Sequence, residues 1–155
     1  MSQHELIHFE DMNPETVYPL GPKHVVADEV IAFASEYDPQ PMHLDEEAGK
    51  ASILGGLAAS GWHSCAMLMR MMCDSYMLRA AAEGAPGLDY VKWIRPVLAD
   101  DVLSGETRVV DRRVSKSRPG IGIVHLRHEL RNQRGETVLV SENPVMLRLR
   151  MPQEG

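Results

Sequence analysis

The sequence has few cysteines, few aromatic residues and no long apolar run, and each shortage narrows what the protein can be. Only two of its 155 residues are cysteines, Cys65 and Cys73. If both lie on one continuous helix, their spacing separates them by about 12 Å along its axis. A disulfide needs Cα atoms within roughly 7 Å, so these two thiols should stay free, as is typical of a reducing compartment.

Basic residues are also in deficit, and no targeting or membrane-spanning signal is evident. Sixteen lysines and arginines face 22 acids, a formal net charge of −6, whereas a nucleic-acid-binding protein normally carries a basic field. The opening MSQHELIHFEDM has acids and histidines where a secretory signal needs a basic start and an apolar core. No apolar stretch approaches the roughly 20 residues of a membrane span. We therefore expect a cytoplasmic protein with neither nucleic acid nor membrane as a partner.

The remaining composition is that of an ordinary globular domain. Apolar residues make up 44% of the chain and charged residues 25%. Aromatics account for only 5%, so the ten methionines and the aliphatic residues must supply most of the core. The length suits one domain over residues 1–155, with loosely attached ends at 1–5 and 151–155.

The first half of the chain predicts a strand followed by helices. Residues 16–26 contain strand formers interrupted by prolines and a glycine, which favours an irregular edge strand or a hairpin. A helical pattern opens at Asp28 and should end at Tyr37 or Asp38, because Pro39 disfavours helical geometry at the residue before it. Residues 45–48 suggest a short helical turn. Residues 57–69 are apolar around most of a helical circumference, which predicts a long helix enclosed by the rest of the protein.

The second half predicts long antiparallel strands over residues 88–95, 101–114, 120–133 and 136–149. In the third of these, Val124, Leu126, His128 and Leu130 share one face of a half-buried strand. Residues 132–135 predict a hairpin turn in which Gly135 takes the positive φ. A sheet curled around one helix is the hotdog arrangement, in the α+β class.

The stretch DPQPMHLD, residues 38–45, places an acid and an imidazole on either side of a Pro-Gln-Pro spacer. One interpretation is structural: a helix ends and the prolines form a loop. The other is chemical: Pro39 and Pro41 stiffen the loop and hold Asp38 and His43 at a fixed separation for proton transfer. Asp45 is better explained as the cap of the following helical turn.

Two segments, FASEYDPQPMHLDEEAG and GGLAASGWHSCAM, resemble the MaoC-like dehydratases, which include the (R)-specific enoyl-CoA hydratases. That family carries Asp-x-Asn-Pro-x-His-x-Asp where this chain has residues 38–45. The resemblance assigns the family's catalytic acid and histidine to Asp38 and His43, and its central-helix glycine to Gly61, 18 positions further on. The segments 93–97 and 132–136 also fit, so the resemblance covers nearly the whole chain.

The chain departs from the family pattern at four places. Gln40 stands where the family has asparagine, Ser60 replaces the histidine before the glycine, and position 39 is a second proline. A serine found further along the central helix in some hydratases falls on residues 67–69, Met-Leu-Met, here. The acid and the imidazole remain, and the acyl substrate is left open.

The resemblance implies hydration of a 2-enoyl-CoA, or the reverse dehydration, without a metal or redox cofactor and with coenzyme A only as part of the substrate. Asp38 and His43 would hold a water between them, either acting as base, and the Gly61 N–H would stabilise charge on the thioester oxygen. Three neighbours are expected to contact substrate: Gln40, Ser60 and Trp62. A basic cluster, Arg112, Arg113, Lys116 and Arg118, is either a solvated loop or a contact for the coenzyme A phosphates.

Other interpretations are weaker or stay open. His43, Asp45 and His63 lack the compact spacing of a metal site, and His63 is better explained by packing. Ser60 lacks the strained strand-turn-helix context of a nucleophile elbow. The methionines at 67–72 are either core filling or the lining of an acyl tunnel.

Two further functions remain compatible with the fold: a hotdog acyl-CoA thioesterase, and a non-catalytic acyl-thioester binding protein. The second is motivated by the Gln40 and Ser60 departures. We also expect at least a homodimer, because one helix under a curved sheet leaves exposed strand edges that a two-fold partner would cover.

Overall fold

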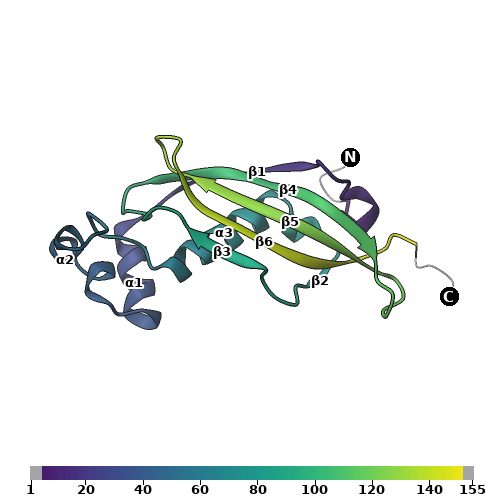
Figure 1. The fold of residues 1–155 in the computed structure, drawn as a ribbon, viewed down its shortest axis with the longest axis horizontal. Helices are drawn as coiled ribbons and strands as arrows, with labels where there is room; N and C mark the ends of the chain where they lie inside the picture. The colour runs from purple at the N-terminus through teal and green to yellow at the C-terminus, as the bar shows by residue number, and fades with distance from the viewer. Residues whose placement is uncertain (1–4, 152–155) are drawn as a thin grey trace.

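A six-stranded antiparallel sheet curves around helix α3 in the computed structural model, which describes residues 5–151 (Figure 1). The sheet order is β1-β4-β5-β6-β2, and β3 pairs with another part of β6. The strands are β1 Val17–His24, β2 Ala82–Gly84, β3 Tyr90–Trp93, β4 Val102–Val114, β5 Ile121–Arg131 and β6 Thr137–Arg148. The hotdog fold of the α+β class is confirmed.

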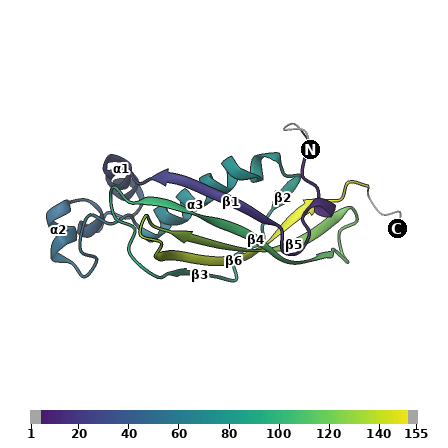
Figure 2. The same cartoon turned by 90° about the horizontal axis from the view of Figure 1, so that it is seen from above.

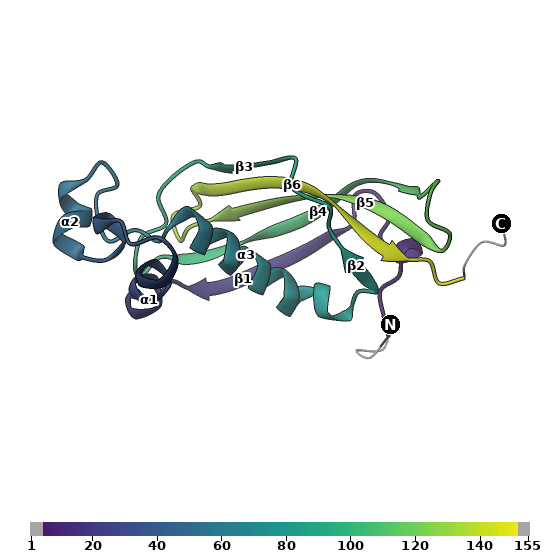
Figure 3. The same cartoon turned by 90° about the horizontal axis from the view of Figure 1, so that it is seen from below.

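Of the three α-helices in the described part of the chain, two lie beyond one end of the sheet and the third runs along its face. They are α1 Ala27–Tyr37, α2 Glu46–Ala51 and α3 Gly61–Ser75, with 3-10 turns η1 Phe9–Asp11, η2 Pro41–His43 and η3 Met77–Arg79. Figures 2 and 3 show α3 lying along one face of the sheet, with α1 and α2 beyond one end. The loop that joins β4 to β5 lies at the opposite end (Figure 1).

The alternation expected for β5 is confirmed. Val124, Leu126 and Leu130 are fully buried and His128 is 1% exposed, while the residues between them lie on the outer face. The hairpin after β5 turns at residues 132–135, with Gly135 at φ 78°. The first strand is an edge strand with a register shift between Leu20 and Lys23, also as predicted.

The start of the central helix was predicted wrongly. Helix α3 begins at Gly61, and residues 57–59 form a buried extended segment whose backbone pairs with residues 97–99. The Ala59 N–H donates to the Val97 carbonyl at 2.8 Å, and the Ala99 N–H donates to the Leu57 carbonyl at 2.9 Å. The apolar pattern of residues 57–59 correctly predicted that they are buried, but it could not distinguish a buried helical turn from a buried extended segment.

Helix α3 is also less enclosed than predicted. Met67, Leu68, Met71 and Met72 pack into the core, but Trp62 is 62% exposed and Met69 is 50% exposed on the outer side. The two cysteines lie on this helix as free thiols. The short strand β2 was not predicted.

The looseness expected at the chain ends concerns residues that, apart from Glu5 and Met151, lie outside the described range. Within that range, no helix combines the length and apolar character needed to span a bilayer.

Candidate active site

The Pro-Gln-Pro loop brings Asp38 and His43 together at the end of α1. The helix ends at Tyr37, and Asp38 takes a non-helical backbone conformation with φ −156° and ψ 69°. Pro41 then opens the 3-10 turn η2, which carries His43 back toward the core. The His43 Nε2 and Asp38 Oδ2 atoms lie 3.5 Å apart, with side-chain exposures of 8% and 17%.

A backbone carbonyl fixes the tautomer of His43. Its Nδ1 lies 2.7 Å from the carbonyl oxygen of Ala58, which can only accept a hydrogen bond, so Nδ1–H is the donor. In the neutral ring Nε2 therefore keeps its lone pair, and this atom faces Asp38. Ala58 belongs to the buried extended segment before α3, so the pairing of that segment with residues 97–99 also orients the imidazole.

Two side chains donate to the Asp38 carboxylate. The Ser60 hydroxyl donates to Oδ2 at 2.7 Å, and the Gln40 amide donates to Oδ1 at 2.7 Å. The hydrogen bond from Ser60, followed by that from Gln40, lowers the pKa of Asp38 below its usual value. The carboxylate is consequently ionised at neutral pH.

The N-terminus of α3 lies at the same place. Gly61 is its first residue and lines the cleft beside Asp38 and His43. Trp93 lies close above it: the indole Nε1–H donates to the Gly61 carbonyl at 2.9 Å, and a Cβ at position 61 would come within 2.7 Å of the indole ring. Position 61 therefore has no room for a side chain unless Trp93 moves.

These groups share a cleft of about 340 Å³ whose walls are mostly apolar, as is common for small-molecule sites. It is lined by Asp38, Gln40, His43, Leu54, Ala58, Ala59, Gly61, Trp62, Ser64, Trp93, Ile94, Arg95, Pro96 and Val97. The candidates Asp38, Gln40, His43, Gly61 and Trp62 thus meet in one place, and Ser60 joins them through its bond to Asp38. None of the methionines at 67–72 lines this cleft, which favours core filling for the buried ones.

Several lining residues were missed in the sequence. Ser64, 2% exposed, lies one helical turn beyond Ser60, and Trp93, Ile94 and Arg95 come from the end of β3 and the loop that follows it. A serine one turn after the helix start was a usable signal for Ser64. The segment 93–97 fits the family pattern but gave no local signal that it lines the cleft, because only the pairing of distant segments brings it there.

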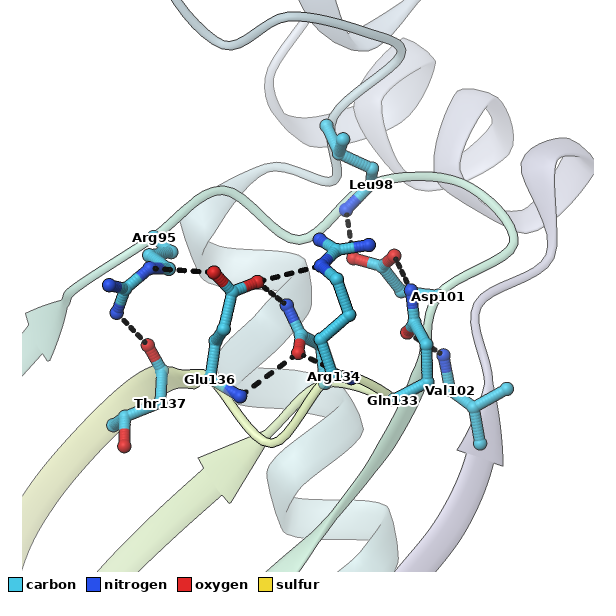
Figure 4. Close-up of polar contacts among 9 residues, drawn as sticks. Arg95, Leu98, Asp101, Val102, Gln133, Arg134, Glu136 and Thr137 are labelled. Carbon is cyan, nitrogen blue, oxygen red and sulfur yellow. Dashed lines mark hydrogen bonds and ion pairs between the residues drawn. The ribbon is translucent and has the colours of Figure 1, made fainter.

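A polar network fixes that wall to the β5–β6 hairpin (Figure 4). Glu136 accepts from the Arg134 guanidinium at 2.8 Å and lies 3.6 Å from Arg95 Nε. Asp101 accepts from the Leu98 N–H at 2.9 Å and from the Gln133 amide at 3.0 Å. The loop between β3 and β4 is therefore held at two points, with Arg95 on the cleft.

The basic cluster is not brought to the cleft within one chain. Arg112 and Arg113 lie near the end of β4, and the strand begins beside the cleft loop at Val102, roughly 33 Å away at about 3.3 Å per residue. Arg112 instead donates to the Phe9 carbonyl at 2.8 Å and lies 4.8 Å from the Phe9 ring centroid. Lys116 and Arg118 follow in the loop at that far end (Figure 1). Within one chain the cluster therefore lies far from Asp38 and His43, and Arg112 anchors the turn η1. Contact of this cluster with coenzyme A phosphates stays a prediction.

Asp45 behaves as predicted and caps α2 by accepting from the Ala48 N–H at 2.9 Å. His63 packs as predicted: it stacks on Phe33 with ring centroids 4.7 Å apart, and burial lowers its pKa. It is not fully satisfied, because its buried Nδ1 has no hydrogen-bond partner among the described residues. Neither residue lines the cleft.

Comparison with known proteins places the chain in a family. The family model described as "MaoC like domain" matches residues 10–129. The chain belongs to the MaoC-like family. A solved MaoC-like dehydratase from Rhodospirillum rubrum is 39% identical, with a TM-score of 0.85 over 94% of this chain and 99% of that one.

Two other proteins match this chain at lower sequence identity. The uncharacterised protein YdeM of Bacillus subtilis is 28% identical over 124 residues, 80% of this chain and 86% of YdeM. The R-hydratase PhaJ1 of Pseudomonas aeruginosa is 19% identical, with a TM-score of 0.76 over 99% of this chain and 94% of PhaJ1, and at that identity it shows the fold alone.

Proposed function

We propose that this MaoC-like protein is a hydro-lyase that adds water to a 2-enoyl-CoA of the (R)-hydratase type, or removes water in the reverse direction. The observation that supports the proposal most directly is the separation between the Asp38 carboxylate and the His43 imidazole. The ionised carboxylate of Asp38 and the Nε2 atom of His43 face each other across 3.5 Å, beside the first N–H of a long helix. The similarity to the MaoC-like dehydratase of Rhodospirillum rubrum supports the choice of a hydration or dehydration reaction.

The gap is suited to a water molecule. At 3.5 Å the two atoms are further apart than a direct hydrogen bond prefers, and both are acceptors when Asp38 is ionised and His43 is neutral. A water that donates one proton to each satisfies both, with its oxygen lone pairs directed at the cleft. A well-oriented water of this kind is a nucleophile held in a near-attack position.

The hydration step then balances as follows. The water oxygen forms a bond to the β-carbon of the enoyl group while its proton passes to a member of the Asp38–His43 pair. The π electrons of the double bond move toward the thioester oxygen, where the Gly61 N–H and the positive end of the α3 dipole stabilise the charge. The proton is then delivered to the α-carbon. No oxidation state changes overall, so this step needs no redox cofactor, and the proposed step uses no metal.

The substrate binds as a coenzyme A thioester in this proposal. The acyl group occupies the apolar part of the cleft beside Leu54 and Val97. Arg95, the one lysine or arginine among the described residues that line the cleft, lies where it can meet the anionic coenzyme A portion. The two free cysteines fit a cytoplasmic enzyme.

A second copy of the chain completes the enzyme as a homodimer. Trp62, Met69, Trp93 and Ile94 are 46–62% exposed on or near the cleft, and β3 pairs only with β6 among the described strands. Apolar side chains and a strand edge together form a surface that a two-fold partner can cover. Light scattering at micromolar concentration should give twice the chain mass of 17.3 kDa, and a clean monomer would rule the dimer out.

The activity is tested by following the loss of the conjugated double bond across a series of 2-enoyl-CoA substrates of increasing acyl length. Asp38→Asn keeps the size of the side chain and removes its charge, and it should lower kcat by about 10²-fold or more, as loss of a general acid–base group does. Glu36→Gln, an exposed acid two residues earlier on α1, is the matched control and should leave the rate unchanged.

The same samples distinguish the alternatives. Release of a free thiol from acyl-CoA, detected with a disulfide reagent, would replace the proposal with thioesterase activity. Tight acyl-CoA binding with no turnover on any substrate would replace it with a binding role. Hydration at the wild-type rate in Asp38→Asn would remove the proposed part of Asp38.

A further inference from the structure

The Asp38 carboxylate is held by the two residues at which this chain departs most directly from the family motif. Gln40, in the family's asparagine position, donates to Oδ1, and Ser60, in the family's histidine position, donates to Oδ2. Each oxygen thus receives one side-chain donor: Gln40 lies two residues after Asp38 and Ser60 lies 22 residues after it. Ser60 is completely buried, whereas Gln40 is exposed at the edge of the cleft.

Ser60 makes this bond instead of the one its position favours. It is the N-cap residue of α3, where a serine hydroxyl normally accepts from the backbone N–H of the second or third helical residue. Here the hydroxyl makes no capping bond and donates to Asp38. The first helical N–H groups are left without their usual side-chain acceptor beside the cleft.

We infer that Ser60 and Gln40 are a pair of positioning residues that divide the acid–base roles: they hold Asp38 as a fixed carboxylate, so that His43 Nε2 takes the proton from water. This inference rests on the proposed function, because it assigns roles within the same site. Both donors bond best to the charged carboxylate, since a protonated carboxyl would give up one of its accepting positions. Nδ1 of His43 is already used by the Ala58 carbonyl, so Nε2 is the ring atom open to a proton.

The charges around Asp38 agree with this division. Among the described residues, His43 on η2 is the one titratable group whose charge affects the pKa of Asp38. Arg95, across the cleft, is paired with Glu136. The carboxylate therefore remains available to stabilise the imidazolium that forms when His43 accepts the proton, and its pKa is lowered chiefly by Ser60 and then by Gln40.

The inference is tested with Ser60→Ala, Gln40→Ala and the double variant. The ionisation of Asp38 is followed by carbon NMR of labelled carboxyl groups, with Asp38→Asn for assignment. We expect the pKa of Asp38 to rise in each single variant and further in the double variant. Ser35→Ala, at an exposed serine on α1, is the matched control and should leave it unchanged. Gln40→Ala lies at the surface, so the test survives if Ser60→Ala fails to fold.

The pH dependence of kcat/KM separates positioning from a merely structural role. In the wild type its acidic limb should follow the titration of the His43 ring measured by NMR, and in the double variant a second acidic group should enter the profile. Gln40→Glu, which replaces the donor by an acceptor, should raise the pKa of Asp38 more than Gln40→Ala does.

Two results would overturn the inference. One is an unchanged pKa of Asp38 in both single variants when both are folded. The other is a wild-type acidic limb that follows Asp38 rather than His43. The NMR titration needs no turnover, so it can be measured in a protein without hydratase activity. If the pKa of Asp38 then shifts as expected, the proposed function is removed but the hydrogen bonds from Ser60 and Gln40 still hold Asp38 as a carboxylate.

Discussion

Two buried imidazole side chains, His43 and His128, differ in the hydrogen-bond partners of their Nε2 atoms. At His128 both nitrogens are occupied: Nδ1 lies 2.8 Å from the Thr107 hydroxyl, and Nε2 lies 2.8 Å from the Asn143 side-chain oxygen. The Tyr76 hydroxyl donates to Thr107 at 3.1 Å and extends this network through the core. At His43 only Nδ1 is occupied, and Nε2 faces a carboxylate across a gap.

The difference shows that burial alone does not mark a catalytic histidine. His128 is 1% exposed and His43 is 6% exposed, yet of the two only His43 has a ring nitrogen that faces a cleft without a hydrogen-bond donor. A fully satisfied polar network fixes one packing arrangement of the core, whereas a group with a free acceptor can move a proton. Substitutions at the two sites should therefore separate activity from stability.

The largest effect is expected at His43. His43→Gln should lower kcat by about 10²- to 10⁴-fold, because the proton acceptor is lost, while the melting temperature changes little. Kinetics and thermal unfolding on the same preparation measure both. Near-normal turnover in a folded His43→Gln protein would contradict the catalytic role that distinguishes His43 from His128.

Next comes the helix N-terminus at Gly61. Gly61→Ala should lower kcat on the order of 10- to 100-fold, because the new Cβ displaces Trp93 and shifts the N–H proposed to stabilise the thioester oxygen. KM should change less than kcat if this donor acts mainly in the transition state. A variant whose KM rises while kcat is unchanged would assign Gly61 to substrate binding alone.

His128→Leu should show the opposite behaviour to His43→Gln. It leaves Thr107 and Asn143 buried with lost partners, so the free energy of unfolding should fall by about 2–4 kcal/mol. Urea unfolding measures this loss, and kcat per folded molecule should stay at the wild-type value. Loss of activity without loss of stability would place His128 in the catalytic machinery.

The two ends of the sheet allow a smaller test. Arg112→Met keeps the apolar stem and removes the bond to the Phe9 carbonyl, which should cost about 1 kcal/mol of stability and leave KM unchanged. Arg95→Met, on the cleft, should raise KM for the coenzyme A substrate. If instead Arg112→Met raises KM several-fold, the basic cluster contacts substrate, which would require a partner chain to bring it to a cleft.

The smallest effect expected is in the pH dependence of stability. Burial lowers the pKa of His128 and of His63 in the folded chain, so below their ordinary value of about 6.5 the unfolded chain binds more protons. The free energy of unfolding should therefore fall as the pH drops through about 6.5. The slope should be shallower in His128→Leu than in the wild type, and equal slopes would show that His128 does not contribute.

The sequence predicted best where the determining signal was local. Strand alternation in β5, the hairpin at Gly135 and the end of α1 before Pro39 each depend on a few consecutive residues. The pair Asp38 and His43 falls in the same class, because five positions and two prolines set its geometry.

What could not be predicted depends on segments distant in sequence. The true start of α3 follows from the pairing of residues 57–59 with 97–99, which no periodicity encodes. The same pairing brings Trp93 and Arg95 to the cleft. The position of the basic cluster relative to the cleft was hidden for a related reason: a run of arginines indicates charge, but only the direction of β4 shows that Arg112 lies far from Asp38 within one chain.

The most direct measurement is a structure of the protein bound to an unreactive analogue of a 2-enoyl-CoA. The expected complex has the carbonyl oxygen within hydrogen-bond distance of the Gly61 N–H, the β-carbon over the gap between Asp38 and His43, and a water in that gap contacting both side chains. An acyl group bound outside this cleft, or oriented with its β-carbon away from His43 Nε2, would contradict the proposed chemistry.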